Sequence, residues 1–195
     1  MARNASFAKG ARRTAGPRDY NQMQDTKIDF SPKCDACAAL CCVMLPFDAG
    51  EDFGFDKAGG VACKHLKAHA CSIHANLEKR GFAGCLRYDC LGAGQRVVQE
   101  VFAGQSWRSD PGLAEPMEQA FRAMRRLHED HALLDAAARL PLTGDEDAQR
   151  LRLLADLDVA DRQTQVSLSA YETGPKPRAV RDFLAQLKAR LRPRR

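Results

Sequence analysis

Cysteine is the residue that most constrains this chain. All eight cysteines lie between Cys34 and Cys90, a window of 57 residues, and the 105 residues that follow contain none. A chain of 195 residues is long enough to bury a hydrophobic core without covalent or metal cross-links. The gathering of thiols in one segment therefore predicts a local task, which is disulfide bonding, metal binding or catalysis.

The N-terminal sequence argues against disulfide bonding. Residues 1–10 are basic but lack the apolar core of a secretory signal. The chain contains no run of about 18 apolar residues, so no membrane span is predicted. We therefore expect a cytoplasmic protein that makes no contact with a membrane. In a reducing cytosol, clustered cysteines more often bind metals or take part in catalysis than form disulfides.

The spacing of the thiols is typical of metal ligands. Cys34 and Cys37 form a Cys-x2-Cys pair, in which one tight turn can direct two thiolates toward one metal. Thiolates are soft ligands, so we expect zinc or iron, including a 4Fe–4S cluster. Eight thiols can complete two four-ligand sites, or one site with spare residues. The predicted ligands are Cys34, Cys37, Cys41, Cys63, Cys71 and Cys85, followed by Cys42 and Cys90.

The adjacent pair Cys41 and Cys42 indicates that the thiols do not all belong to one metal site. Side chains of neighbouring residues diverge, so the two are poorly suited to one tetrahedral metal. We expect one of them to join Cys34 and Cys37, while the other serves a second site. Packing as a small buried apolar residue is the alternative for either cysteine.

Each histidine and glycine near the cysteines also has more than one interpretation. His74 lies three residues after Cys71 and can replace a thiol in a Cys3His site; hydrogen bonding or helix capping is the alternative. His128 and His131 lack the His-Glu-x-x-His pattern, and we interpret them as packing residues. The glycines of residues 92–94 complete no phosphate-binding loop. The sequence thus predicts no nucleotide cofactor and no identifiable catalytic residue.

Composition divides the chain into three regions. Residues 1–30 carry six Lys or Arg against three Asp or Glu and predict a disordered basic arm. Residues 31–110 form the cysteine-cluster module, balanced at nine against nine. Residues 111–195 predict a helical region with a basic tail. Residues 176–195 contain eight Lys or Arg and one Asp. Basic ends can contact nucleic acid or an acidic protein, although a solvated surface is favoured.

Apolar spacing predicts the helices. A stripe from Leu113 to Leu134 indicates a long amphipathic helix that begins at Asp110-Pro111 and ends before Pro141. A capping box at Thr143 begins a second helix, which could extend toward Leu168. A loop over 174–177 precedes a third helix. Within the module, residues 72–80 predict a short helix, and residues 95–102 a helix or a strand.

The expected fold class is mainly α. A small, irregular, cysteine-rich metal-binding module should pack against about three C-terminal amphipathic helices.

The cysteine pattern also resembles a known family. The string CDACAALCC at residues 34–42, with later cysteines at 63, 71, 85 and 90, resembles the CxxCxxCC cysteine-cluster family. The strings CCVMLPFDAG, GFAGC and YDCLGAGQ are most similar to the cysteine-rich head of some bacterial pentapeptide-repeat proteins. The resemblance covers residues 33–107 and, more loosely, 124–134. It implies zinc or iron chelation, and a similar cluster in flagellin lysine methylases implies a modification activity by analogy.

Two departures from the family limit what the resemblance implies. Three residues, rather than two, separate Cys37 from the double cysteine, and no pentapeptide tract is present. The leading hypothesis is a metal-binding cysteine-cluster protein. The alternatives are a cluster-dependent modification or redox enzyme, and a metal-stabilised interaction protein with basic ends. A protein partner fits the last alternative better than nucleic acid does.

Overall fold

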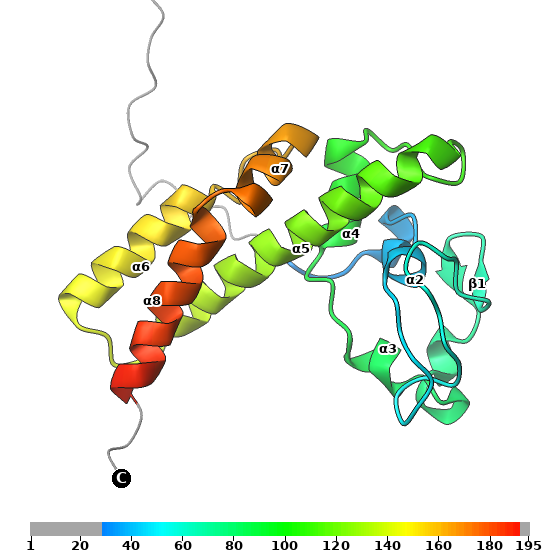
Figure 1. The fold of residues 1–195 in the computed structure, drawn as a ribbon, viewed down its shortest axis with the longest axis horizontal. Coiled ribbons are helices and arrows are strands. Elements are labelled where there is room, and N and C mark those ends of the chain that lie inside the picture. Colours follow the sequence, from blue (N-terminus) through cyan, green and yellow to red (C-terminus); the bar gives the residue numbers. More distant parts are fainter. Residues whose placement is uncertain (1–28, 192–195) are drawn as a thin grey trace, which may run out of the picture.

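The chain folds into a cysteine module and a helical layer that share one long helix. The computed structural model describes residues 29–191, so residues 1–28 of the basic arm predicted over 1–30 and the last four residues lie outside the described part. The described chain contains seven α-helices and a single two-stranded sheet. The predicted class, mainly α, is confirmed (Figure 1). No helix in the described part is long and apolar enough to cross a bilayer.

The module consists of short elements. In chain order they are η1 (Cys34–Ala36), α2 (Leu40–Met44), β1 (Leu66–Lys67), β2 (Ala70–Cys71), η2 (His74–Asn76), η3 (Glu78–Arg80) and α3 (Ala83–Arg87). The strands β1 and β2 are antiparallel, with Leu66 opposite Cys71. The predicted helix over 72–80 is instead two 3-10 turns. Gly81 ends the second turn, with a φ of 77° and its N–H donated to the Glu78 carbonyl.

Residues 93–102 continue the chain into the helical layer. Helix α4 (Ala93–Arg96) runs directly into a π-helical turn, η4 (Val97–Val101), in which the Phe102 N–H donates to the Val97 carbonyl at 3.1 Å. Of the two predicted alternatives, helix and strand, the helix is correct. Val97, Val98 and Phe102 are buried, so the predicted apolar stripe faces the core.

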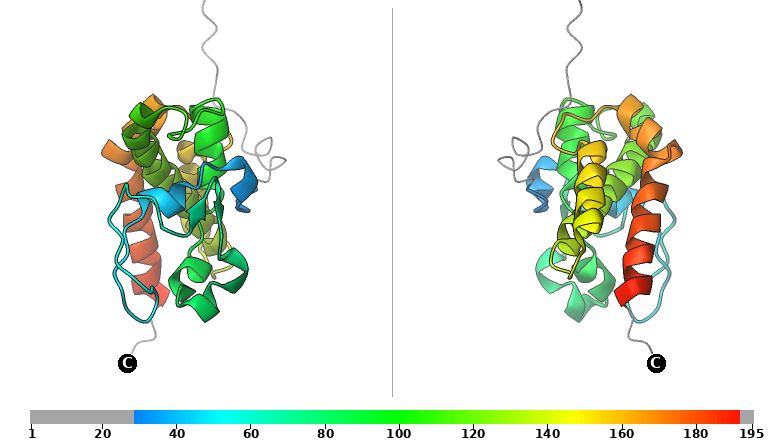
Figure 2. Two further views of the ribbon diagram at one scale, coloured as in Figure 1. Left: turned by 90° about the vertical axis from the view of Figure 1, so that its right-hand side faces the viewer. Right: turned by 90° about the vertical axis from the view of Figure 1, so that its left-hand side faces the viewer.

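The long helix α5 organises the rest of the molecule. Asp110 accepts a hydrogen bond from the Gly112 N–H and caps η5 (Pro111–Leu113), which leads into α5 (Ala114–Ala137). Helix α5 contacts α2 and α4 on the module side. It also contacts α6 (Gly144–Leu157), α7 (Gln165–Thr173) and α8 (Lys176–Leu191). Helices α6 and α8 are in contact, and the right-hand view of Figure 2 shows both.

The helical layer holds four helices rather than three. The predicted extension of the second helix toward Leu168 is wrong, because Asp158 adopts a left-handed conformation and ends α6. A second capping box then begins α7, with the Thr164 side chain accepting from the Ser167 N–H. The predicted loop over 174–177 is also shorter, because α8 already begins at Lys176.

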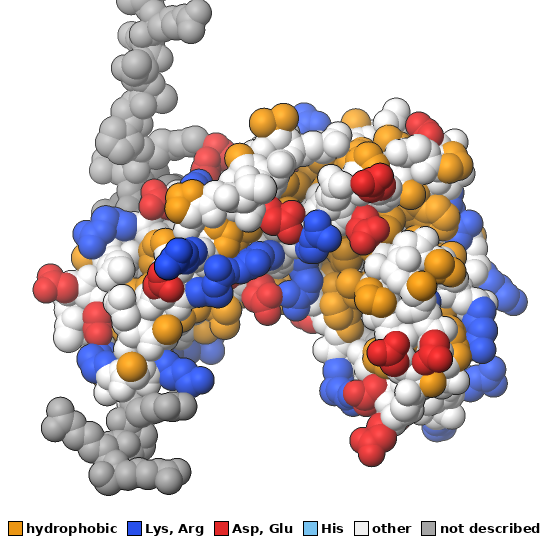
Figure 3. Space-filling model, viewed as in Figure 1, with side chains coloured by type: hydrophobic (Ala, Val, Ile, Leu, Met, Phe, Trp, Pro, Cys, Tyr) orange, Lys and Arg blue, Asp and Glu red, His pale blue; other side chains and the backbone are white. Residues whose placement is uncertain are grey.

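Figure 3 shows how the module and the helical layer shape the surface of the molecule. The module and the helical layer form two lobes with an open notch between them below α5. The largest buried side chains include Met117, Met124 and Leu127 of α5 and Leu40 of α2. One core therefore extends from the helical layer into the module at α2.

Candidate metal centre

All eight cysteines are free thiols. Within residues 29–191, no three His, Cys, Asp or Glu side chains are placed so that they could hold a metal ion as they stand. Because one torsion angle sets the position of each cysteine sulfur, thiols can move without a change in the backbone. The surroundings of each thiol therefore decide which ones can meet.

Four thiols lie beside the helical layer, and we call them group A: Cys34, Cys37, Cys41 and Cys90. The turn η1 holds the first two, with the Cys37 N–H donating to the Cys34 carbonyl at 3.3 Å. Cys37, Cys41 and Cys90 pack against the same hydrophobic core. Burial first, with smaller contributions from the nearby thiols of Cys90 and Cys34, raises the pKa of Cys37 to about 11. Burial also raises the pKa of Cys34, and the thiols of Cys90 and Cys42 add to this effect.

A glycine makes room for group A. A Cβ at Gly94 would lie 2.5 Å from the Cys37 sulfur, closer than two such atoms can approach. Gly94 is in the first turn of α4, whose Ala93 N–H donates to the Cys90 carbonyl at 3.0 Å. The missing side chain thus lets the η1 turn approach the segment that carries Cys90.

The other four thiols lie in the outer part of the module, and we call them group B: Cys42, Cys63, Cys71 and Cys85. The Cys63 N–H donates to the Cys42 carbonyl at 2.9 Å, and the Leu66 N–H donates to the Cys63 carbonyl at 2.9 Å. Since Leu66 pairs with Cys71, one backbone path links three of these cysteines. Burial raises the pKa of Cys85 to about 11, and the thiols of Cys42, Cys63 and Cys71 contribute.

The adjacent cysteines connect the two groups. A hydrogen bond between the thiols of Cys41 and Cys42 raises the pKa of Cys41 and lowers that of Cys42 to about 7. Their remaining neighbours differ. Cys41 is near Cys37 and Cys90, whereas the Lys57 ammonium favours the Cys42 thiolate.

Lys57 places a buried positive charge beside group B. Its side chain is 6% exposed, and its ammonium donates to the carbonyls of Val43 at 2.9 Å, Leu45 at 2.6 Å and Ala58 at 3.0 Å. All three donors are thus used, and two of them cap the end of α2. Burial lowers the pKa of Lys57, while nearby thiols, Cys63 first among them, raise it. Lysine is rarely buried without such partners.

Lys57 is not among the site residues predicted from the sequence. Two other basic residues that are close to cysteines in sequence, Lys64 and Arg87, have other partners. The Lys64 ammonium lies 3.8 Å from the centre of the Phe55 ring, and Arg87 pairs with Asp52. The chain did carry one signal, a lone lysine between aromatic residues and glycines, but only the backbone carbonyls around it make burial possible.

Aromatic side chains support the outer module. Phe47 stacks on Phe53 at 4.4 Å between ring centres, and Phe82 contacts Phe55 and His65, each at 5.2 Å. Phe82 also ties Cys85 to this cluster, because its carbonyl accepts the Cys85 N–H at 3.1 Å. His65 therefore packs among rings.

Tyr88 presents an unsatisfied hydroxyl near group A. Its oxygen is buried and meets no hydrogen-bond partner in the described part of the chain. Burial raises the pKa of Tyr88, and the thiols of Cys41 and Cys90 contribute. The Arg125 guanidinium lies 5.7 Å from the centre of the Tyr88 ring and can only donate hydrogen bonds. The Tyr88 hydrogen therefore lacks an acceptor beside two thiols.

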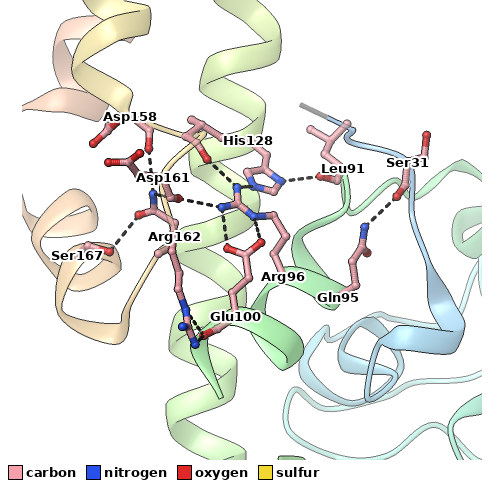
Figure 4. Close-up of polar contacts among 12 residues, drawn as sticks. Ser31, Leu91, Gln95, Arg96, Glu100, His128, Asp158, Asp161, Arg162 and Ser167 are labelled. Carbon is pink, nitrogen blue, oxygen red and sulfur yellow. Dashed lines mark hydrogen bonds and ion pairs between the residues drawn. The ribbon is translucent and has the colours of Figure 1, made fainter. Parts of the chain in front are cut away.

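Helix α5 fixes the backbone on both sides of Cys90. The Arg125 Nε donates to the Asp89 carbonyl at 3.2 Å, and the His128 Nδ1 lies 2.6 Å from the Leu91 carbonyl (Figure 4). Leu91 has a φ of 51°, an unfavourable value for leucine. Since Cys90 lies between these two hydrogen-bonded carbonyls, α5 fixes the backbone position of Cys90.

Arg96 fixes the protonation of His128. Its Nη1 donates to the His128 Nε2 and to the Val159 carbonyl, each at 2.9 Å. Its guanidinium also pairs with Glu100 at 2.7 Å. Because arginine can only donate, the His128 Nε2 accepts and the Nδ1 carries the proton given to Leu91. Both nitrogens of His128 are thus used within the protein, which agrees with its interpretation as a packing residue.

The predicted ligand His74 lies apart from these contacts. It is exposed at the start of η2 and makes no hydrogen bond or ring contact with any described residue. Its role as a ligand stays a prediction. The remaining predicted residues, the eight cysteines, all belong to group A or group B.

The donor chemistry of the two groups suits soft metal ions. Each group offers four free thiols, the ligand set of zinc and of iron–sulfur clusters. The unsatisfied Tyr88 hydroxyl beside group A suits a thiolate acceptor, which metal binding would create. In the described part of the chain, the chemistry of these residues suits thiolate ligation of a metal, although their side chains as they stand form no such site.

Comparison with known proteins adds one relative. The chain is 46% identical over 102 residues to the uncharacterized protein YybG of Bacillus subtilis. The match covers 52% of this chain and 37% of the relative, so the chain spans well under half of the relative's length. No protein-family model and no solved structure matches the chain.

Proposed function

We propose that this chain is a metal-binding protein whose cysteine module holds zinc or an iron centre through thiolates. The strongest support comes from the segment over 50–76, which carries Cys63 and Cys71 and in which Lys57 is the one buried residue. A segment that buries so little apolar surface gains little hydrophobic stabilisation. Metal–thiolate bonds would fix its shape, since metal binding supplies about 10–16 kcal/mol in small zinc peptides.

The eight cysteines are the proposed ligands. Neighbouring side chains stabilise some of their thiolates and position their backbone. Lys57 stabilises thiolates in group B, and α5 positions Cys90 in group A through Arg125 and His128. A reducing cytoplasm would keep the thiols available. Zinc held by four thiolates is a closed structural site, whereas an iron–sulfur cluster would add electron transfer.

Metal analysis tests the proposal. The chain is purified without oxygen and without added metal, and its zinc, iron and acid-labile sulfide are measured together with a visible spectrum. We expect stoichiometric metal, colourless with zinc or brown with an iron–sulfur cluster. The control variant carries Cys63→Ser and Cys71→Ser, which removes two thiols with little change in size, and it should bind less metal. A metal-free wild-type chain whose thiols are all oxidised would overturn the proposal.

A further inference from the structure

The number of metal centres follows from how the fold distributes the thiols. Cysteines that are distant in sequence are neighbours in space, and the order along the chain does not predict which ones. Cys90, the last in sequence, lies with Cys34 and Cys37, because the Cys37 sulfur occupies the space beside Gly94, four residues after Cys90. Cys42, adjacent to Cys41, lies with the distant Cys63 through a backbone hydrogen bond of 2.9 Å.

The two groups also rest on different supports. Three members of group A pack against the main hydrophobic core, and α5 grips the backbone around Cys90. In group B, Cys71 is part of strand β2, and the Cys85 N–H donates to the carbonyl of Phe82, whose ring contacts His65. No group B cysteine is among the described residues that pack against that core. The two sets of four thiols thus rest on different supports and meet at the Cys41 and Cys42 thiols.

Charge distinguishes the groups as well. A divalent metal bound by four thiolates carries a net charge of −2, and a buried site of that charge needs a cation nearby. Group B has the Lys57 ammonium at its edge, held by three carbonyls. Near group A, the Arg125 guanidinium lies over the Tyr88 ring and is already paired with Glu129 at 2.6 Å. The two groups therefore differ in the charge beside them.

We propose that the chain binds two soft divalent metal ions such as zinc, one at Cys34, Cys37, Cys41 and Cys90 and one at Cys42, Cys63, Cys71 and Cys85. This inference rests on the proposed function. The peptide bond between Cys41 and Cys42 is the shared boundary of the two sites, and α2 sends one thiol to each. The two ions are thus close neighbours that use no common ligand.

Thiol protection in the wild-type chain tests the division directly. Metal-free, reduced protein receives zero, one or two equivalents of zinc, is treated with an alkylating reagent, and is analysed by mass spectrometry after digestion. We expect four protected cysteines at one equivalent and eight at two. At one equivalent the protected residues should be all of group A or all of group B within each molecule.

Two variants give an independent measurement. Cys90→Ser should reduce bound zinc from two to one per chain and leave group B protected. Cys85→Ser should do the same and leave group A protected. Substituting cobalt(II), whose absorption reports tetrahedral thiolate ligands, checks that the remaining site is intact, and far-UV circular dichroism checks that the variant is folded.

The outcomes separate this inference from the proposed function. Saturation at one metal, or a protected set that mixes the groups, overturns the two-site division while metal binding stands. Loss of both metals in either variant, with the helices retained, also overturns it. No bound metal at any ratio overturns the proposed function itself.

Discussion

Tyr88 illustrates how a single polar group can point to a missing ligand. Its hydroxyl is buried beside the thiols of Cys41 and Cys90, with no acceptor for its hydrogen in the described part of the chain. An unsatisfied buried donor destabilises a protein by about 1–3 kcal/mol. A thiolate formed on metal binding would accept this hydrogen and remove the penalty.

Tyr88→Phe should therefore have opposite effects in the two states. In the metal-free chain, it should raise the free energy of unfolding by about 1 kcal/mol, because the unsatisfied group is removed. In the zinc-loaded chain, it should lower that free energy by a similar amount. Urea unfolding with and without zinc measures both. Tyr171→Phe is the control, because the Tyr171 hydroxyl donates to Asp130 and its loss should destabilise both states equally.

His128 predicts how stability depends on pH. Burial lowers its pKa from the ordinary value of 6.5 to about 4, and the neighbouring Arg96 guanidinium acts in the same direction. The unfolded chain therefore takes up this proton at a higher pH than the folded chain. Stability from this residue is complete above pH 6.5 and is lost as the pH falls toward 4.

The metal-free chain should thus lose about 2 kcal/mol of stability from this histidine between about pH 7 and pH 5. Urea unfolding over this range measures the loss. His128→Gln cannot be protonated there, so its stability should change less with pH, although His131 also has a lowered pKa and keeps part of the slope. An equal slope in wild type and variant would contradict the assignment.

Among the elements, α4 matters because it must approach the η1 turn closely. Gly94→Ala would place a carbon 2.5 Å from the Cys37 sulfur. Forced overpacking of this kind lowers the free energy of unfolding by about 1–3 kcal/mol, and displacing Cys37 should weaken metal binding by group A. Urea unfolding and competition with a zinc chelator measure the two effects.

Gly144→Ala is the matched control for this change. Gly144 is in the first turn of α6, and a Cβ there would meet no atom within 4 Å. Because alanine favours helix by up to about 1 kcal/mol, this variant should be unchanged or more stable. Equal losses in the two variants would mean that glycine flexibility, rather than space beside Cys37, matters at position 94.

Element boundaries show where local sequence is sufficient. The predicted capping box of α6 is confirmed, with the Thr143 side chain accepting from the Glu146 N–H and the Glu146 side chain accepting from the Thr143 N–H. The break between α6 and α7 was missed, although Thr164 and Ser167 form a comparable box. The apolar stripe continues across the break and hides it.

At the scale of the whole molecule, the two lobes differ in what stabilises them. The helical layer has a large apolar core that includes Leu134, Leu154 and Phe183. The outer module over 50–76 has almost no buried apolar surface. Removing a metal should therefore unfold the outer module and leave the helical layer intact.

Hydrogen exchange during chelation measures this difference. After chelator is added to the reduced, metal-loaded chain, the amides of residues 50–76 should exchange fastest, while those of α5 stay protected. Far-UV circular dichroism should change little, because the module contributes only short helices. Simultaneous loss of protection in α5 and the module would show that the two lobes unfold as one unit.

The sequence by itself determined the mainly α class, the long helix α5, the cap of α6 and the gathering of eight thiols in one segment. These features depend on local spacing, caps and composition, which a single chain displays directly. The tertiary structure alone decided which thiols are neighbours, because Gly94, Lys57 and the grip of α5 on Cys90 depend on contacts between distant residues. The cysteines thus divide by what their backbone packs against, a property that spacing along the chain does not contain.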